Sequence, residues 1–171
     1  MAKSAIMVMA AICLMSVVGS AYGFDKFFVE GKVYCDTCRI QFVSRISEFL
    51  PGATVRLECK EAANETITYV KDAVTDSAGK YCIEVEGDHE EELCEVFLID
   101  SPRLDCNEVK TEVANLETAS RISLTHKNGI VSAVREANPL GFLKADPLSV
   151  CPEIFKELGL NANGTANTDY N

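Results

Sequence analysis

The sequence has no tryptophan, few glycines and prolines, and few cationic side chains. Its 171 residues include 10 glycines and 5 prolines, which excludes collagen-like and proline-rich repeats. Sixteen Lys and Arg residues face 26 Asp and Glu residues, so the net charge is −10. Binding to nucleic acid or to an anionic membrane surface depends on clustered cationic side chains. We therefore expect no nucleic-acid partner and no membrane partner.

Only one long apolar run occurs, and it lies at the N-terminus. Lys3 precedes the run over 5–18, and Ala21 and Gly23 are small residues at the −3 and −1 positions of a cleavage site. The run is shorter than the about 20 apolar residues of a membrane span. This pattern predicts a cleaved signal peptide over 1–23. The mature protein is then secreted, to the extracellular space or the cell wall, and begins at Phe24.

Cysteine is abundant for a chain of this length. The sequence has eight cysteines, and cleavage of the signal peptide removes Cys13. In an oxidising compartment the other seven are expected to form disulfides. Because seven is odd, at least one cysteine stays free or pairs between molecules. The spacing of the cysteines alone does not choose among the possible pairings.

Hydrophobic periodicity predicts short strands along most of the mature chain. Period-two alternation, or a run of β-branched and aromatic residues, marks strands over 27–34, 53–59, 66–74, 80–85, 93–99, 121–125 and 130–134. Asn128–Gly129 predicts a hairpin between the last two strands, with a four-residue loop from His126 as the alternative to a two-residue turn. Helix-like and strand-like spacing are mixed over 40–50, which stays undecided. About seven strands indicate an all-β fold, an antiparallel sandwich or small barrel.

One short helix is predicted near the C-terminus. Pro152 suits its first turn, Glu153 lies near the positive end of the helix dipole, and Gly159 ends it. The residues over 161–171 have no apolar pattern and are expected to form a flexible tail. The mature domain is therefore expected to span 24–160.

Three motifs suggest chemistry, but a structural explanation is favoured for each. Cys35 and Cys38 have redox-motif spacing, but they follow a strand instead of opening a helix, which favours disulfides to distant partners. Zinc is disfavoured there because no second pair follows. The acidic segment 84–95 lacks the ligand order of a calcium loop and is expected to be a solvated hairpin loop. His89 and His126 are expected to be exposed, without a nucleophile or orienting carboxylate nearby. We therefore predict no catalytic residue, no metal site and no cofactor.

Two sites for N-glycosylation are predicted. Asn64 and Asn163 each begin an Asn-x-Thr sequence, in a chain expected to enter the secretory pathway. Asn64 lies in a predicted loop and is favoured over Asn163, which is close to the chain end.

The segment Val33–Arg39 resembles the signature of the olive-pollen major-allergen-like family, also called the pollen allergen and extensin family. The similarity covers the whole mature domain except the tail. It continues through Pro51–Ala53, Leu57–Cys59, Cys94–Glu95, Asp105–Glu108, Asn138–Phe142, Cys151 and Lys156–Gly159.

The resemblance implies a small secreted plant glycoprotein with an antiparallel β fold and three disulfides. By this resemblance the pairs are Cys35–Cys106, Cys38–Cys151 and Cys59–Cys94. Cys82 stands outside the six-cysteine pattern and is expected to be a free thiol that reacts slowly, because Glu84 and Glu86 disfavour the thiolate. Asn128–Ile130 lacks the Ser or Thr of a glycosylation acceptor found in some relatives.

Members of this family are abundant in pollen, several are allergens, and roles in pollen hydration, germination and tube growth are attributed to them. The resemblance thus implies a non-enzymatic extracellular ligand, with a receptor-kinase ectodomain or a cell-wall component as its partner. The alternative is a structural or carbohydrate-binding module of the cell wall. A disulfide oxidoreductase would require a direct Cys35–Cys38 bond. We expect a monomer, with a Cys82-linked dimer as the alternative state.

Overall fold

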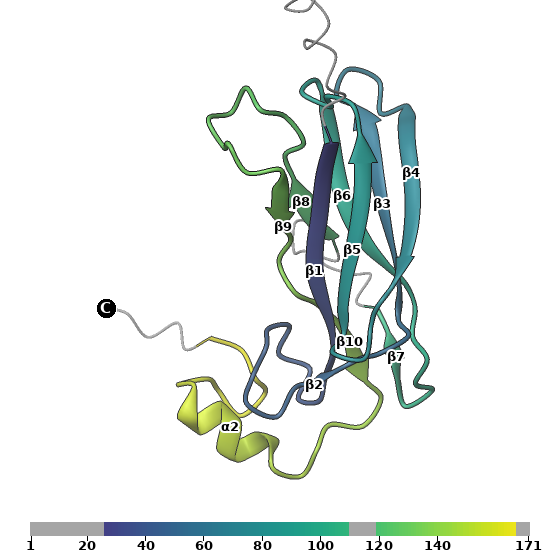
Figure 1. Cartoon of the computed structure of the whole chain (residues 1–171). Coiled ribbons are helices and arrows are strands. Elements are labelled where there is room, and N and C mark those ends of the chain that lie inside the picture. The colour runs from purple at the N-terminus through teal and green to yellow at the C-terminus, as the bar shows by residue number, and fades with distance from the viewer. Residues whose placement is uncertain (1–25, 110–118, 167–171) are drawn as a thin grey trace, which may run out of the picture.

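Two β-sheets pack face to face, and a small helical lobe lies at one end of them (Figure 1). The computed structural model describes residues 26–109 and 119–166. The first sheet contains β1 (Lys26–Asp36), β2 (Glu48–Phe49), β5 (Lys80–Glu86), β7 (Cys106–Glu108), β9 (Val134–Glu136) and β10 (Leu140–Lys144). The second sheet contains β4 (Ile67–Val74), β3 (Thr54–Glu61), β6 (Glu92–Asp100) and β8 (Ala119–Ile122), in that order. The helix is α2 (Cys151–Glu157).

The long strand β1 organises the first sheet. One of its edges pairs antiparallel with β5 and then, near its end, with β2. Its other edge pairs with β9 and then with β10, and both of these pairings are parallel. The predicted all-β fold, short C-terminal helix and three disulfides are confirmed. The sequence pattern did not reveal the two parallel pairings, because a parallel partner is joined by a long connection with no turn signal of its own.

The core lies between the two sheets and is made by alternate residues of each strand. Period-two alternation turns every second side chain inward, as the sequence predicted. These inward residues have at most 3% of their surface exposed, and they include Phe27, Val29, Val33, Val55, Leu57, Tyr81, Ile83, Val85 and Val96. Burying a side chain of this size contributes about 1.5–3 kcal/mol each.

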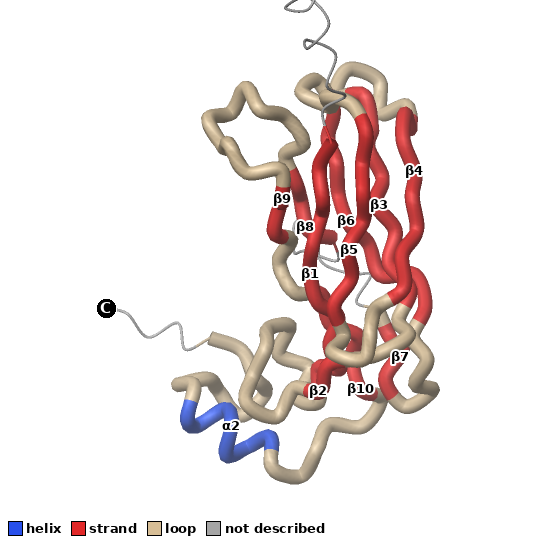
Figure 2. Tube along the Cα trace, viewed as in Figure 1, coloured by secondary structure: helices blue, strands red, loops and turns tan. Residues whose placement is uncertain are grey.

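The predicted hairpin around Asn128–Gly129 is wrong. The strands on its two sides, β8 and β9, belong to different sheets. The guanidinium group of buried Arg135 donates hydrogen bonds to the carbonyl oxygens of Ser123 (3.0 Å), Thr125 (2.8 Å) and Ile130 (3.3 Å). These carbonyl groups accept hydrogen bonds from a side chain instead of from a neighbouring strand. The segment therefore crosses between the sheets as a loop (Figure 2).

The acidic segment 84–95 does not form a hairpin either. Its two ends belong to β5 in the first sheet and β6 in the second, and residues 87–91 connect them. Its charges are partly neutralised, since Lys127 forms ion pairs with both Asp88 and Glu90. The segment is therefore tied to the neighbouring loop instead of being spread out by repulsion between its carboxylates.

The α2 lobe consists of residues 37–47 together with α2 and the turn that follows it, up to Ala166. The undecided segment 40–50 forms turns and β2, with no helix. The lobe has its own small core of five buried residues, Cys38, Ile40, Cys151, Ile154 and Phe155. Arg39 and Gln41 have positive φ angles of 59° and 65°. The buried carboxylate of Asp36 holds this bend by accepting hydrogen bonds from the N–H groups of Cys38 and Gln41.

The two ends of the chain are described only in part. The predicted signal peptide over 1–23 lies outside the described residues. Of the predicted tail, 161–166 form a turn closed by a bridge between Leu160 and Ala166, and 167–171 lie outside the described residues. Within the described ranges, no helix has the length and apolar character that crossing a membrane requires.

Candidate binding groove

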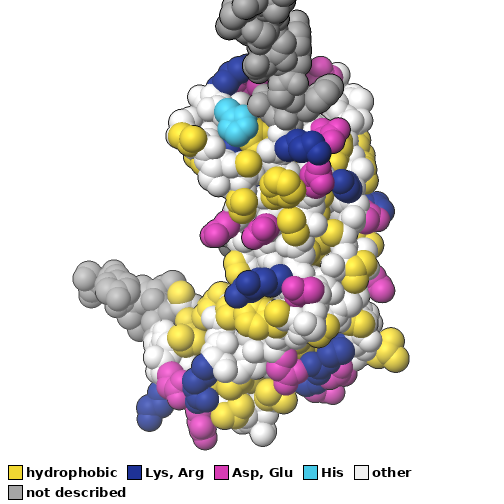
Figure 3. Space-filling view, in the orientation of Figure 1, with side chains coloured by type: hydrophobic (Ala, Val, Ile, Leu, Met, Phe, Trp, Pro, Cys, Tyr) yellow, Lys and Arg dark blue, Asp and Glu magenta, His cyan; other side chains and the backbone are white. Residues whose placement is uncertain are grey.

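A groove opens beside β1 where its parallel partner changes. Phe28–Glu30 pair with β9 and Val33–Asp36 pair with β10, so Ala137–Pro139 leave the sheet next to Gly31 and Lys32. Ala137 N–H donates to the carbonyl oxygen of Glu30 at 2.7 Å, and Pro139 has no N–H to donate. The groove has a volume of about 960 Å³. Figure 3 shows that this face is hollowed between the sandwich and the α2 lobe, and that hydrophobic side chains gather there beside charged ones.

A buried tyrosine lines the groove. Tyr81 lies opposite Gly31 on the neighbouring strand, and its ring crosses the space that a side chain at Gly31 would fill. A Cβ atom on Gly31 would lie 2.3 Å from Tyr81 Oη. This Oη atom makes no hydrogen bond to the described residues, and burial raises the pKa of the phenol. The phenol therefore stays neutral, and its hydroxyl is buried.

Charges of both signs surround the groove. Glu30 and Glu136 are exposed on adjacent strands, and Lys80 lies beyond them. The ammonium group of Lys32 lies 4.9 Å from the centre of the Phe49 ring, which keeps it beside the groove. Backbone N–H groups of Lys80 and Ala78 donate to the Asp76 carboxylate and lower its pKa. The rim is thus suited to a partner that carries both charged and apolar groups.

Cys82 is a free, exposed thiol at the same groove. Its pKa is raised, first by burial and then by the nearby carboxylates of Glu30 and Glu84. Sequence reasoning named Glu84 and Glu86, which lie on the same strand as Cys82. It missed Glu30, which is opposite Cys82 on β1 and is visible only from the strand register.

Three disulfides brace the fold. Cys35–Cys106 joins β1 to β7, Cys38–Cys151 joins the bend after β1 to α2, and Cys59–Cys94 joins the paired strands β3 and β6. They span 71, 113 and 35 residues of sequence, respectively. These are the pairs that the family resemblance implied. Cys35 and Cys38 are not bonded to each other, so the redox-motif spacing forms no redox ring here.

Both predicted glycosylation acceptors are exposed. Asn64 accepts a hydrogen bond from the N–H of Thr66 at 2.9 Å in a short loop before β4. Asn163 lies in the turn after α2, where its side-chain oxygen accepts a hydrogen bond from the Thr165 hydroxyl at 2.8 Å. Attachment of glycans to these residues stays a prediction.

The two histidines differ in their surroundings. His126 is exposed, and its ring stacks on Phe27 with 4.6 Å between ring centres. The expectation of an exposed histidine is wrong for His89, whose side chain is 10% exposed. Its Nδ1 atom lies 2.8 Å from Glu92 Oε2, and its ring packs against the Tyr69 ring in a T-shaped arrangement, with 5.4 Å between ring centres. The sequence offered one signal for this contact, which is the spacing of His89 and Glu92. A tight turn brings the side chains of two residues three positions apart close together.

The fold, the groove and the disulfides define a class of protein, a disulfide-braced β-sandwich with a groove beside its longest strand. A family model described as "Pollen protein Ole e 1 like" matches residues 25–159, and the chain belongs to this family. The chain is 50% identical to an Olee1-like protein of Betula pendula over 161 residues, which cover 94% of this chain and 96% of that protein. It is 47% identical to the anther-specific protein LAT52 of Solanum lycopersicum over 161 residues, 94% of this chain and 97% of that one.

A solved structure supports the fold. The crystal structure of the major plantain pollen allergen Pla l 1 matches with a TM-score of 0.67 and 33% identity, and the match covers 74% of this chain and 99% of that chain. Relatives of this chain are named as pollen allergens and pollen-specific proteins, not as enzymes. The comparisons support a role related to pollen.

Proposed function

We propose that the protein is a secreted, non-enzymatic ligand of pollen or related reproductive tissue. It acts outside the cell as a signalling partner in pollen hydration, germination or tube growth. The partner in this proposal is the ectodomain of a receptor kinase, which contacts the groove beside β1. The protein acts as a monomer, and a Cys82-linked dimer would cover part of the same groove.

The observation that carries this proposal is the groove on a braced frame. β1 and β5 hold its floor in a regular ladder, and the disulfide Cys35–Cys106 fixes the end of β1. Such a frame loses little conformational entropy when a partner binds, which favours recognition. The charged rim offers hydrogen bonds and ion pairs to a protein surface.

The alternative, a carbohydrate-binding module, has weaker support. Sugar platforms use exposed aromatic rings, and the sequence has no tryptophan. Phe42 and Phe49 are 40% and 41% exposed, but the Lys32 ammonium group lies over the Phe49 ring. A ring covered in this way offers less of its face to a sugar.

The test is binding of purified protein to pollen receptor-kinase ectodomains and, in parallel, to wall polysaccharide. Lys32→Glu and Glu136→Lys reverse the charge of the groove rim. Arg121→Glu is the matched control, because Arg121 is exposed on the other sheet. We expect an ectodomain to bind, both groove variants to weaken binding at least about tenfold, and the control to bind normally.

Equal loss of binding in the control would contradict the placement of the interface. Binding to polysaccharide with no ectodomain bound would contradict the ligand proposal and favour the wall module.

A further inference from the structure

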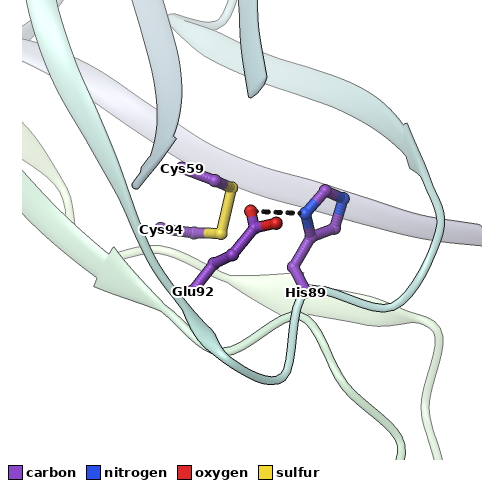
Figure 4. A group of neighbouring side chains, drawn as sticks. All are labelled: Cys59, His89, Glu92 and Cys94. Carbon is purple, nitrogen blue, oxygen red and sulfur yellow. Dashed lines mark hydrogen bonds and ion pairs between the residues drawn. A yellow bond between two sulfur atoms is a disulfide. The ribbon is translucent and has the colours of Figure 1, made fainter. Parts of the chain in front are cut away.

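Four side chains with metal-binding atoms meet at one end of the second sheet (Figure 4). Cys59 comes from β3, Cys94 and Glu92 from β6, and His89 from the connection before β6. The strand register places Cys59 opposite Cys94, and period two places Glu92 on the same face as Cys94. One ligand atom from each of the four residues lies within 4.8 Å of all the others.

The histidine and the carboxylate are held by further contacts. His89 directs Nδ1 toward Glu92, and its Nε2 lies 3.3 Å from the carbonyl oxygen of Glu86. The Thr68 hydroxyl donates to Glu92 Oε2 at 2.7 Å. Histidine ligands of metals usually donate their second ring N–H to a carbonyl or carboxylate, and carboxylate ligands are themselves hydrogen-bonded. The supporting contacts of a metal site are therefore in place.

We infer that these four residues form a zinc site that is open only when the Cys59–Cys94 disulfide is reduced. The metal ligand is the thiolate, and a sulfur in a disulfide carries no such charge. Reduction also frees the two sulfurs to move apart to the corners of a tetrahedron. The set of two thiolates, one imidazole and one carboxylate then matches the ligands that Zn²⁺ prefers. The site is separate from the groove beside β1.

The reaction balances with a dithiol as the reductant. The dithiol gives two electrons and two protons to the Cys59–Cys94 bond and becomes a disulfide itself. The two new thiols lose their protons to water as Zn²⁺ binds, and two Zn–S bonds form. Zinc thus competes with reoxidation, because it holds both thiolates.

Access is possible because the site lies close to the end of the sheet. β3 ends two residues beyond Cys59, and Cys94 is the third residue of β6. The side chains of His89 and Glu92 are 10% and 21% exposed, whereas Cys59 and Cys94 beside them are buried. A metal ion therefore reaches the sulfurs by moving these two side chains, with the core left in place.

The decisive test opens the disulfide without reductant, so that the other two disulfides stay closed. Cys94→Ser in a Cys82→Ser background leaves one thiolate, His89 and Glu92, with water as the fourth ligand. We expect one Zn²⁺ per chain by calorimetry, and tetrahedral Co²⁺ absorption with a thiolate band. The Cys82→Ser protein, with its disulfide intact, should bind neither ion. Adding His89→Ala or Glu92→Gln should weaken zinc binding at least about tenfold. The matched control is Glu91→Gln, which removes an exposed carboxylate next to the site and should change nothing.

Thr68→Val tests the supporting hydrogen bond. It should weaken zinc binding by about 10–100-fold while the Co²⁺ spectrum stays tetrahedral. Equal zinc binding with and without the intact disulfide would overturn the inference, as would an unchanged affinity in the His89→Ala protein.

Two further measurements cover a Cys94→Ser chain that does not fold. Cys59→Ser in the same background leaves the other thiol of the pair and should bind zinc in the same way. In the partly reduced wild-type protein, zinc should protect Cys59 and Cys94 from alkylation, while reduced Cys38 and Cys151 react. Equal protection of all four cysteines would contradict the site.

Discussion

The sandwich and the α2 lobe are held together in different ways. The sandwich buries a large core between two hydrogen-bonded sheets, so many side chains support each strand. The lobe has five buried core residues, and two of them are the cysteines of one disulfide. A seven-residue helix is too short to be stable by itself in water. The comparison teaches that packing contributes much of the stability of the sandwich, with the disulfides adding to it, whereas the lobe depends on one covalent bond.

Reduction of all disulfides should have the largest effect, and it tests how far packing alone supports the sandwich. Each disulfide contributes about 2–5 kcal/mol, and the total stability of a domain is about 5–15 kcal/mol. We expect the cooperative thermal unfolding followed by circular dichroism to be lost in excess reductant. An unchanged unfolding temperature, with all thiols shown to be free, would contradict this.

Gly141→Ala should have the next largest effect, on the sheet end nearest the lobe. A Cβ atom at Gly141 would lie 2.6 Å from Cζ of buried Tyr34, its partner on β1. Relieving this clash should cost about 1–3 kcal/mol in the free energy of unfolding. The control is Gly129→Ala, where no atom lies within 4 Å and only the positive φ of 83° opposes a side chain. It should cost about 1 kcal/mol, and a larger cost than that of Gly141→Ala would contradict the packing argument.

Asp36→Ala should affect the lobe more than the sandwich. The change leaves the N–H groups of Cys38 and Gln41 without their acceptor. Leaving a buried donor unpaired lowers the free energy of unfolding by about 1–3 kcal/mol. Hydrogen exchange should become faster over 37–47 and stay slow in β3. Asp146→Ala, at an exposed position, is the control and should leave both regions unchanged. Faster exchange throughout β3 would show that the lobe and the sandwich are coupled.

Acid should have the smallest effect, near the junction of the two regions. Arg103 and Lys144 hold the pKa of the Asp105 carboxyl well below its usual value of 3.8. Because the folded-state pKa is depressed, this stabilisation is present above pH 3.8 and is lost as the pH falls toward the folded pKa. We expect Asp105→Asn to flatten the fall in stability below pH 4, measured by urea unfolding. The same steep fall in the variant would exclude Asp105 as its source.

Sequence periodicity predicted the sandwich well, because its strands have one buried face. Phe27 and Val29 alternate with exposed or partly exposed residues, and the same pattern located β3 and β5. The lobe could not be predicted in this way. Its bend at Arg39 and Gln41 is held by the Asp36 carboxylate, and its core is closed by a disulfide to a residue 113 positions away. Neither contact produces a hydrophobic periodicity in the sequence.

The candidate sites were predicted less well than the sandwich. Cys82 was expected to be a free thiol, but the groove on which it lies depends on where β9 ends and β10 begins. His89 was expected to be exposed because only its own loop was considered. Its neighbours Tyr69 and Cys59 come from β4 and β3, and a single chain segment does not reveal such contacts.

The most direct test compares two variants that each lack one disulfide. Cys38→Ala/Cys151→Ala removes the bond of the lobe, and Cys59→Ala/Cys94→Ala removes the bond between two strands that a hydrogen-bonded ladder already joins. Hydrogen exchange measured by mass spectrometry reports each region separately. We predict that the first variant loses protection over α2 and keeps it in β1, while the second keeps protection in both. A protected α2 without its disulfide, or loss of the sandwich together with the lobe, would contradict the account.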